Sequence, residues 1–223
     1  MTPTALAPSR PLLYTYRRCP YAMRARMALL VAGLAFDAQE IVLREKPPAL
    51  LQASPKGTVP VLVLPDGLVI EQSWDIVRWA LTQPDRAESV QAWWHRAQRE
   101  ANDALLHIND GEFKHHLDRY KYPERFAAAG HTAVDGLQAH HRAQAVQVLL
   151  EPLEARLVEA DFLGGQSPCA TDIGIFPFVR QFAAVDPSWF DSLPLPRVKQ
   201  WLAGWLQSPL FAACMLKPSA QAH

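Results

Sequence analysis

The stretch LLYTYRRCPYAMRA, residues 12–25, decides the fold of the first part of the chain. It opens with apolar and β-prone residues, which predict a strand over 12–16. Good helix formers with apolar residues at helical spacing follow, and they predict a helix over 21–31. Pro20 suits the first helical position, where its missing N–H costs nothing, and Gly33 suits the residue just past the helix end. Cys19 is therefore expected in the turn that leads into a helix N-terminus.

A thiol at this place is the main candidate for chemistry in the chain. Unpaired N–H groups and the positive end of the helix dipole stabilise a thiolate, which lowers the pKa of the thiol from about 8.5. Arg17, Arg18 and Arg24 could add positive potential. The alternative is a cysteine that merely packs in the turn, and these residues alone leave both interpretations open.

The residues after Gly33 continue the pattern of a small α/β domain. Asp66-Gly67 is a strong hairpin signal, so residues 68–70 should pair antiparallel with the strand before them. Strands separated by helices are expected to pair in parallel. The remaining expected elements are strands over 36–43 and 59–64 and helices over 49–53 and 73–81.

Beyond residue 83 the strand signals largely vanish, which predicts an all-α domain. We expect breaks at Asp110-Gly111 and at Tyr122-Pro123. Residues 109–114 and 118–122 are interpreted as a solvated interhelical loop, with the rim of a substrate site as the alternative. The expected helices are 92–108, 137–160, 172–182 and 198–206. The expected division is a flexible leader over 1–10, an α/β domain over 11–82, a linker near 82–89 and the all-α domain over 90–218.

Composition narrows the class of protein. Of 223 residues, 49% are hydrophobic and 20% charged, as in an ordinary soluble globular protein. Basic and acidic residues both number 22, so there is no electrostatic signal for a nucleic-acid partner. No apolar run could cross a membrane, and no secretory signal precedes residue 11. Three cysteines make no disulfide framework, and together these features predict a cytoplasmic protein.

Two pairs of histidines invite a metal interpretation, and we do not expect a metal site. His115-His116 and His140-His141 are sequence neighbours. Adjacent residues on a helix point in different directions, unlike residues four apart. No cluster of cysteines or carboxylates completes either pair.

Two further positions have both a structural and a binding interpretation. Pro60 opens a predicted strand, where an ordinary trans proline is the default; a cis Val59–Pro60 bond would instead expose the Val59 backbone to a peptide-like ligand. Ser73 is a good N-cap for the helix that follows Gln72. The same helix start could hold a carboxylate through its N–H groups and the Ser73 hydroxyl.

Taken together, these elements resemble the glutathione transferase superfamily, whose first domain is thioredoxin-like and whose second is all-helical. The match is clear over residues 12–81. Cys19-Pro20-Tyr21-Ala22 is similar to the active-site stretch of the cysteine-type members, which are the omega class, the dehydroascorbate reductases and the glutaredoxin 2-like proteins. Together with Ala25-Arg26-Met27, and with Ser73-Trp74-Asp75-Ile76-Val77, this stretch is especially similar to the glutaredoxin 2-like proteins.

The resemblance implies a role for each matching residue. Cys19 would be the catalytic thiolate, next to Pro20 and Tyr21 of the glutathione site. Val59 would hold the cysteinyl backbone of glutathione, with Pro60 as the cis-proline of the family. Gln72 and Ser73 would hold its γ-glutamyl end, and Lys46 its glycine carboxylate. In the second domain, Cys169 to Phe176 resembles the capping box of a buried helix, with Cys169 structural.

Two departures from the family pattern affect the expected mechanism. Ala22 replaces the second cysteine of the glutaredoxin 2-like proteins, so Cys19 cannot form an internal disulfide there. Gln72 stands where many members have glutamate, which removes a charge attraction. We therefore expect a monothiol glutathione-dependent thiol transferase that acts on mixed disulfides or glutathionyl conjugates.

The expected enzyme has glutathione as co-substrate and needs no metal. Its second substrate would be a small-molecule or protein thiol or electrophile. The alternatives are a glutathione-conjugating transferase and a non-catalytic binding or stress-adaptor protein of the same fold. Neither a nucleic acid nor a membrane is an expected partner, and the chain is expected to be a monomer or a homodimer.

Overall fold

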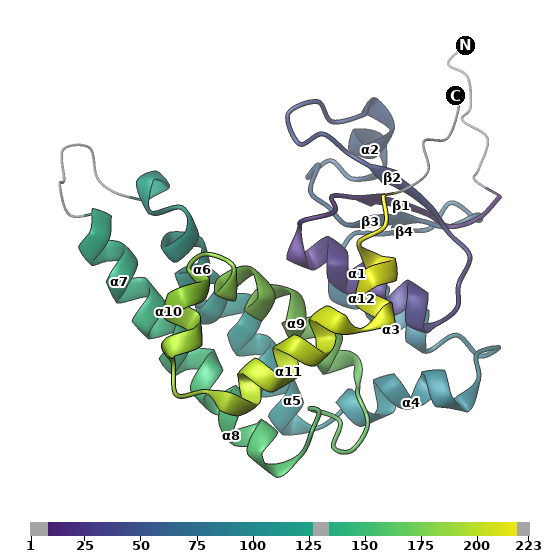
Figure 1. The fold of residues 1–223 in the computed structure, drawn as a ribbon. Helices are drawn as coiled ribbons and strands as arrows, with labels where there is room; N and C mark the ends of the chain where they lie inside the picture. Colours follow the sequence, from purple (N-terminus) through teal and green to yellow (C-terminus); the bar gives the residue numbers. More distant parts are fainter. Residues whose placement is uncertain (1–8, 127–133, 218–223) are drawn as a thin grey trace. The chain divides into compact units, whose positions relative to one another are not determined.

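The structure is a computed structural model that describes residues 9–126 and 134–217 (Figure 1). Residues 1–8 of the predicted leader lie outside the described residues. The chain forms two compact units. The first comprises the residues up to Gln91 together with those from Ser208 onward, and the second comprises Ala92–Gln207.

The first unit contains the predicted strands and helices in their predicted order. The thioredoxin-like arrangement that the family resemblance implied is confirmed. Its elements are β1 (Leu12–Thr15), α1 (Pro20–Val31), β2 (Asp37–Glu40), α2 (Pro48–Ala53), β3 (Val61–Val63), β4 (Val69–Ile70), α3 (Ser73–Leu81) and the C-terminal helix α12 (Pro209–Cys214).

In the described residues the sheet has four strands in the order β2-β1-β3-β4. β1 pairs in parallel with β2, and the hairpin places β4 antiparallel to β3, both as predicted. The prediction of parallel pairing is wrong for β3, which runs antiparallel to β1. The reason lies in α2, whose six residues span only about 9 Å. The link through this short helix returns the chain to the sheet at the end where β2 left it.

Both faces of the sheet are covered by helices. Figure 1 shows α1 and α3 on one side of the sheet and α2 on the other. Side chains alternate along a strand, so neighbouring residues of β1 serve different cores. Tyr14 belongs to one buried cluster with Ile41, Leu50 and Val61. Its neighbour Leu13 points to the opposite face of the sheet and is fully buried there. This two-sided burial fixes the end of β1, from which the chain enters the loop that carries Cys19.

Helix α12 packs against α1 of the first unit. The sequence predicts one helical domain over residues 90–218, which includes α12. The guanidinium of Arg26 on α1 donates from Nε to the carbonyl of Cys214 at 3.0 Å, and the thiol of Cys214 is 3.9 Å from the carbonyl of Met23. A buried arginine needs hydrogen-bond acceptors, and α12 supplies one of them to Arg26.

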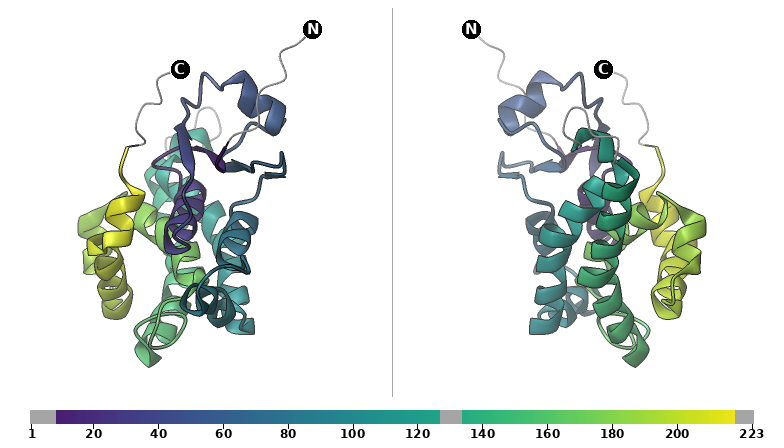
Figure 2. Two further views of the ribbon diagram at one scale, coloured as in Figure 1. Left: turned by 90° about the vertical axis from the view of Figure 1, so that its right-hand side faces the viewer. Right: turned by 90° about the vertical axis from the view of Figure 1, so that its left-hand side faces the viewer.

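The second unit is all-helical among its described residues, as predicted. No helix in the described part of the chain is long and apolar enough to span a membrane. Figure 2 shows the helices from two further sides. They are α4 (Glu88–Ala97), which starts before the unit, α5 (Glu100–Ile108), α6 (Lys114–Lys121), α7 (Val134–Ala145), α8 (Glu151–Glu159), α9 (Ala170–Ala183), α10 (Pro187–Ser192) and α11 (Pro196–Gln207).

The break predicted at Asp110-Gly111 is wrong. Residues Asn109–Phe113 form a π-helical turn that joins α5 to α6 without an interruption. Phe113, Leu117 and Tyr120 are buried, so the interpretation of this stretch as a solvated loop is also wrong. The helix predicted over 92–108 is instead divided into α4 and α5, and the long predicted helix over 137–160 contains a second π-helical turn, Val146–Leu150.

Asp172 organises the centre of the second unit. It is fully buried near the start of α9, the helix with the largest run of buried residues. Its carboxylate accepts hydrogen bonds from the backbone N–H of Leu163 at 3.0 Å, the backbone N–H of Cys169 at 2.9 Å and Nε1 of Trp201 at 2.9 Å. Burial raises the pKa of Asp172, and these three donors oppose that effect.

Replacing this carboxylate should destabilise the protein strongly. Asp172→Ala leaves three buried N–H donors without their acceptor, and each such loss costs about 1–3 kcal/mol. We expect the free energy of unfolding to fall by about 3 kcal/mol or more, measured by urea denaturation. Asp161→Ala, at an exposed position nearby in sequence, should change it by less than about 0.5 kcal/mol. Equal effects of the two substitutions would contradict this account of Asp172.

Candidate active site

Cys19 is the residue directly before α1, with the extended backbone of an N-cap (φ −73°, ψ 123°). Its N–H donates to the carbonyl of Tyr16 at 3.0 Å, and its own carbonyl accepts the N–H of Met23 at 2.9 Å. Pro20 occupies the first turn, as predicted, and its buried ring fixes where the helix starts. The thiol is half-buried at the positive end of the helix, which is an environment that favours a thiolate.

The loop before β3 lies against this thiol. Sγ of Cys19 donates to the carbonyl oxygen of Val59 at 3.8 Å, a contact that spans forty residues of sequence. The Val59–Pro60 peptide bond is cis, as the family resemblance implied and contrary to the default trans proline. Pro60 is buried and Val59 half-buried. The structure therefore brings three of the predicted site residues together.

The helix predicted over 73–81 is confirmed as α3, but its N-cap differs by one residue from the prediction. Gln72, not Ser73, is the N-cap, because its carbonyl accepts the N–H of Ile76 at 3.0 Å. Ser73 is the first helical residue and is buried, whereas Gln72 is exposed. The Ser73 hydroxyl accepts a hydrogen bond from Nη1 of Arg24 at 3.3 Å.

Arg24 connects the two helix starts. It is fully buried on α1, with its guanidinium 5.5 Å from the ring centre of Tyr21 and 5.6 Å from that of Trp74. Stacking on aromatic rings and bonding to a hydroxyl are both suited to a planar guanidinium. The positive charge of Arg24 therefore lies next to Ser73, at the N-terminus of α3.

Sequence reasoning treated Arg24 only as a source of potential for Cys19 and missed its bond to Ser73. The signal was present, since Arg24 stands among the apolar residues Met23 and Met27 on a helix that the sheet covers. A charged residue at such a place requires a polar partner from another element. The identity of that partner depends on the packing of α1 against α3.

The other two basic residues near Cys19 are placed differently. Arg17 is 3.7 Å from the carboxylate of Glu40 through Nε, and its backbone N–H also donates to that carboxylate at 3.2 Å. The charge of Arg17 is therefore partly neutralised on β2. Arg18 is exposed. Among the features described, the helix N-terminus remains the main influence that favours a Cys19 thiolate.

Lys46 lies in the segment before α2 and is exposed. Its side chain passes over Gly57, where an added Cβ would be 3.2 Å from Nζ of Lys46 and 2.9 Å from Leu51. Gly57 also has a positive φ of 58°, so a larger residue would be strained there. This arrangement brings the ammonium group of Lys46 to the loop that leads into Val59.

The other two cysteines have different environments. Cys214 is the last residue of α12 and is buried. Cys169 is buried at the start of α9, where burial and the adjacent Asp172 carboxylate raise the pKa of its thiol to about 12. A thiol in this state is not a nucleophile at neutral pH. The prediction that Cys169 is structural agrees with its surroundings.

Comparison with protein families matches both units. Residues 18–83 match "Glutathione S-transferase, N-terminal domain", and residues 124–204 match "Glutathione S-transferase, C-terminal domain". The two matches together cover well over half of the chain. The chain belongs to the glutathione S-transferase superfamily.

Individual members of the superfamily are similar over different extents. A probable glutathione transferase of Aplysia californica is 38% identical over 55 residues, which is 25% of this chain. The chain spans 60% of the length of that relative. A glutathione transferase family member from Pseudomonas fluorescens, solved with two glutathione molecules, is 20% identical with a TM-score of 0.75 and 95% coverage of both chains. One from Pseudomonas putida, with glutathione disulfide bound, is also 20% identical with a TM-score of 0.75, over 97% of this chain and 95% of that one. Likeness at this identity establishes a common fold.

The position of Cys19 predicts its reactivity toward alkylation. Because the helix N-terminus stabilises the thiolate, labelling by iodoacetamide should titrate with a midpoint below the ordinary value of about 8.5. Mass spectrometry after digestion reports each cysteine separately. The buried Cys169 and Cys214 serve as internal controls and should label only after unfolding. A Cys19 midpoint at or above the ordinary value would contradict an activated thiol.

Proposed function

We propose that this glutathione S-transferase is of the cysteine type and acts as a monothiol glutathione-dependent thiol transferase. Its substrates would be mixed disulfides of glutathione or glutathionyl conjugates. The observation that carries the proposal is the thiol of Cys19 at the N-terminus of α1, 3.8 Å from the Val59 carbonyl. Such an enzyme would depend on the reduced glutathione of the cytoplasm.

The proposed site surrounds that thiol with groups that suit the parts of glutathione. The backbone of Val59, next to Pro60, would pair with the cysteinyl peptide unit and bring the glutathione sulfur to Cys19. Ser73 and the first N–H groups of α3 would hold the γ-glutamyl carboxylate, with Gln72 beside it. Support for this placement comes from Arg24, whose guanidinium adds positive charge beneath Ser73.

The remaining predicted residues complete the proposed site. Lys46 would meet the glycine carboxylate from the loop around Gly57. Pro20 and Tyr21 would form the wall next to the thiol, with Tyr21 also packed beside Arg24. The structural relatives solved with glutathione or glutathione disulfide support a ligand of this kind.

The chemistry requires one protein sulfur. The Cys19 thiolate attacks the glutathione sulfur of a mixed disulfide, so that a protein–glutathione disulfide forms and the substrate leaves as its thiolate. The thiolate of a second glutathione then attacks the glutathione sulfur on Cys19, releasing glutathione disulfide and restoring the Cys19 thiolate. One free glutathione is oxidised for each mixed disulfide reduced, and the glutathione sulfur carried by the substrate stays at the disulfide level throughout. Ala22 supplies no second thiol at the position of a dithiol enzyme.

Binding of glutathione should depend on Ser73. Reduced glutathione at millimolar concentration should raise the melting temperature of the protein by mass action. Ser73→Ala removes a hydroxyl that bonds a charged group, so glutathione should bind about tenfold more weakly. Thermal shift against glutathione concentration measures this change.

The matched control is Ser89→Ala, at an exposed serine of α4 within the first unit. It should leave the glutathione shift unchanged. Absence of any shift in the unsubstituted protein would favour the non-catalytic adaptor. Equal weakening by both substitutions would contradict the placement of the γ-glutamyl group at Ser73.

The two enzymatic activities can be separated by removing single thiols. We expect reduction of a small glutathione mixed disulfide and little conjugation of a chlorodinitrobenzene-type electrophile, because a cysteine thiolate repels the ionised thiol that conjugation needs. Cys19→Ala should abolish the reduction. The matched variants Cys169→Ala and Cys214→Ala should retain it, with glutathione disulfide formation as the measured rate.

The activity of Cys19→Ala and the conjugating activity of the unsubstituted protein each test the monothiol mechanism. Full thiol-transfer activity in Cys19→Ala, or conjugation as the dominant activity of the unsubstituted protein, would overturn the monothiol mechanism. Either outcome would leave the membership of the superfamily intact, because that rests on the matches of the two domains.

A further inference from the structure

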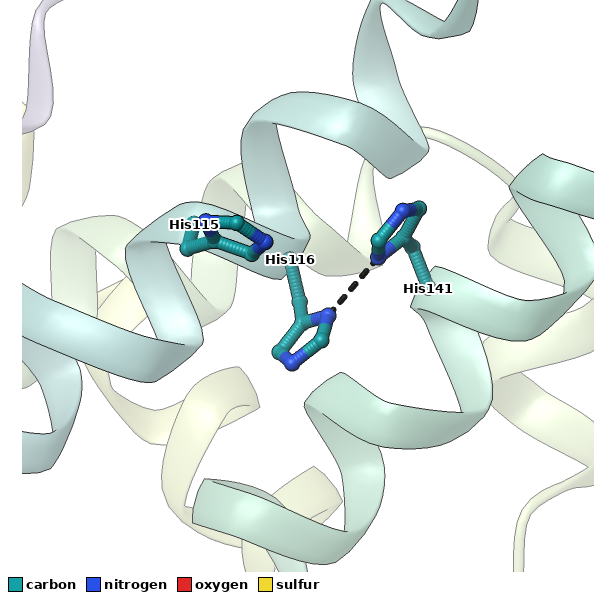
Figure 3. Close-up of side chains that lie close together, drawn as sticks. All are labelled: His115, His116 and His141. Atoms are coloured by element: carbon teal, nitrogen blue, oxygen red, sulfur yellow. Dashed lines mark hydrogen bonds between the residues drawn. The ribbon is translucent and has the colours of Figure 1, made fainter. Parts of the chain in front are cut away.

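Three histidine side chains converge between α6 and α7 (Figure 3). His115 and His116 are neighbours on α6, and His141 comes from α7, which packs along α6. The ring centres of His116 and His141 are 5.0 Å apart, and those of His115 and His141 are 5.9 Å apart. Each ring offers a nitrogen, and the three nitrogens lie within 4.8 Å of one another.

Taken alone, neither pair of sequence-adjacent histidines predicts a metal site. The rings of His115 and His116 meet edge to face, with 5.0 Å between their centres and 80° between their planes. The third ring comes from the neighbouring helix (Figure 3), and its centre is 5.9 Å from that of His115 and 5.0 Å from that of His116. His140 also lies close by, with its ring centre 5.1 Å from that of His141. The packing of two helices therefore assembles a cluster that neither sequence pair forms alone.

The closest contact in the cluster joins two nitrogen atoms. Nδ1 of His116 and Nδ1 of His141 are 2.8 Å apart, marked by the dashed line in Figure 3. Two neutral rings at this distance share one proton, since one nitrogen must donate and the other accept. A neutral imidazole keeps one ring nitrogen with a lone pair for a ligand.

We propose that His115, His116 and His141 form a binding site for one divalent transition-metal ion of the zinc, nickel or copper type. Neutral imidazoles suit these ions rather than magnesium or calcium, which prefer oxygen ligands. The site lies wholly in the second unit and does not depend on the proposed chemistry of Cys19. A fourth position of the ion would be taken by water or by His140.

The metal would replace the proton that His116 and His141 share. The ring that donates this proton moves it to its own Nε2, so both Nδ1 lone pairs face the ion and no net proton is released. Zinc–nitrogen bonds of about 2.0–2.1 Å at a tetrahedral angle need the two nitrogens about 3.3 Å apart. The present 2.8 Å separation must therefore widen by about half an ångström, which small rotations of the side chains achieve.

Arg119 is the competitor for this site. Its Nη1 is 3.0 Å from Nδ1 of His115 and 3.3 Å from the carbonyl of the same residue. A guanidinium only donates, so it occupies the lone pair of that nitrogen and places a positive charge beside the cluster. Its guanidinium also stacks on the ring of Phe126, with 4.3 Å between Cζ and the ring centre, which helps to hold it beside His115. Removing the charge of Arg119 should therefore strengthen metal binding.

The experiment uses full-length protein without a histidine tag, treated with EDTA and desalted. Titration calorimetry with zinc chloride, and separately with nickel chloride, should show one ion bound per chain with micromolar affinity. His116→Ala and His141→Ala should each weaken binding by roughly tenfold or more. His115→Ala, at an exposed position that the core does not need, tests the same point where His141→Ala fails to fold. The matched control is His107→Ala, an exposed histidine of α5, which should bind as the unsubstituted protein does.

Arg119→Gln gives a readout that loss of fold cannot imitate. It should bind zinc more tightly than the unsubstituted protein. Unchanged or weaker affinity in this variant would contradict His115 as the third ligand. Absence of binding to the unsubstituted protein, or equal affinity in His116→Ala and His107→Ala, would overturn the site as a whole.

Discussion

The buried guanidinium of Arg26 holds together the part of the first unit that carries Cys19. It donates to the hydroxyl of Thr15, to the carbonyls of Tyr16 and Arg17, and to the carbonyl of Cys214 on α12. Its donors thus join the end of β1, the loop before Cys19 and the C-terminal segment. A charge without acceptors would be costly at this depth, so these segments must meet around it. The loop geometry at Cys19 follows from this constraint.

The same dependence on distant partners separates what the sequence predicts from what it does not. The strand–turn–helix around Cys19 follows from local signals, with Pro20 at the start and Gly33 at the end of α1. The direction of β3 does not, because it depends on where a six-residue α2 returns the chain. Asp110-Gly111 reads as a break, yet Phe113 is buried and the backbone remains helical through a π-helical turn. In each case tertiary packing overrides a local preference.

The candidate site residues also divide into those with a local sequence signature and those that depend on contacts between distant parts of the chain. The positions of Cys19 and Pro60 were identified from sequence because each has a local signature, although the cis bond required the family resemblance. The bond between Arg24 and Ser73 joins residues 49 apart, and the histidine cluster joins α6 to α7 across the interval from His116 to His141. Pair contacts of this kind leave no periodic pattern in a single sequence. Their sign in the sequence is a charged or ionisable residue on a helix face that is expected to be buried.

Two cysteines of this chain occupy helix N-termini in different surroundings. Cys19 and Cys169 are both N-cap residues, of α1 and α9, with extended backbones. Cys169 is fully buried, and the Asp172 carboxylate in the first turn of its helix helps to raise its pKa to about 12. The first turn of α1, which begins with Pro20, contains no acidic residue, and the Cys19 thiol is half-exposed. The dipole favours a thiolate at both helices, so solvent access and a first turn without an acidic residue are what distinguish Cys19, the proposed nucleophile, from Cys169.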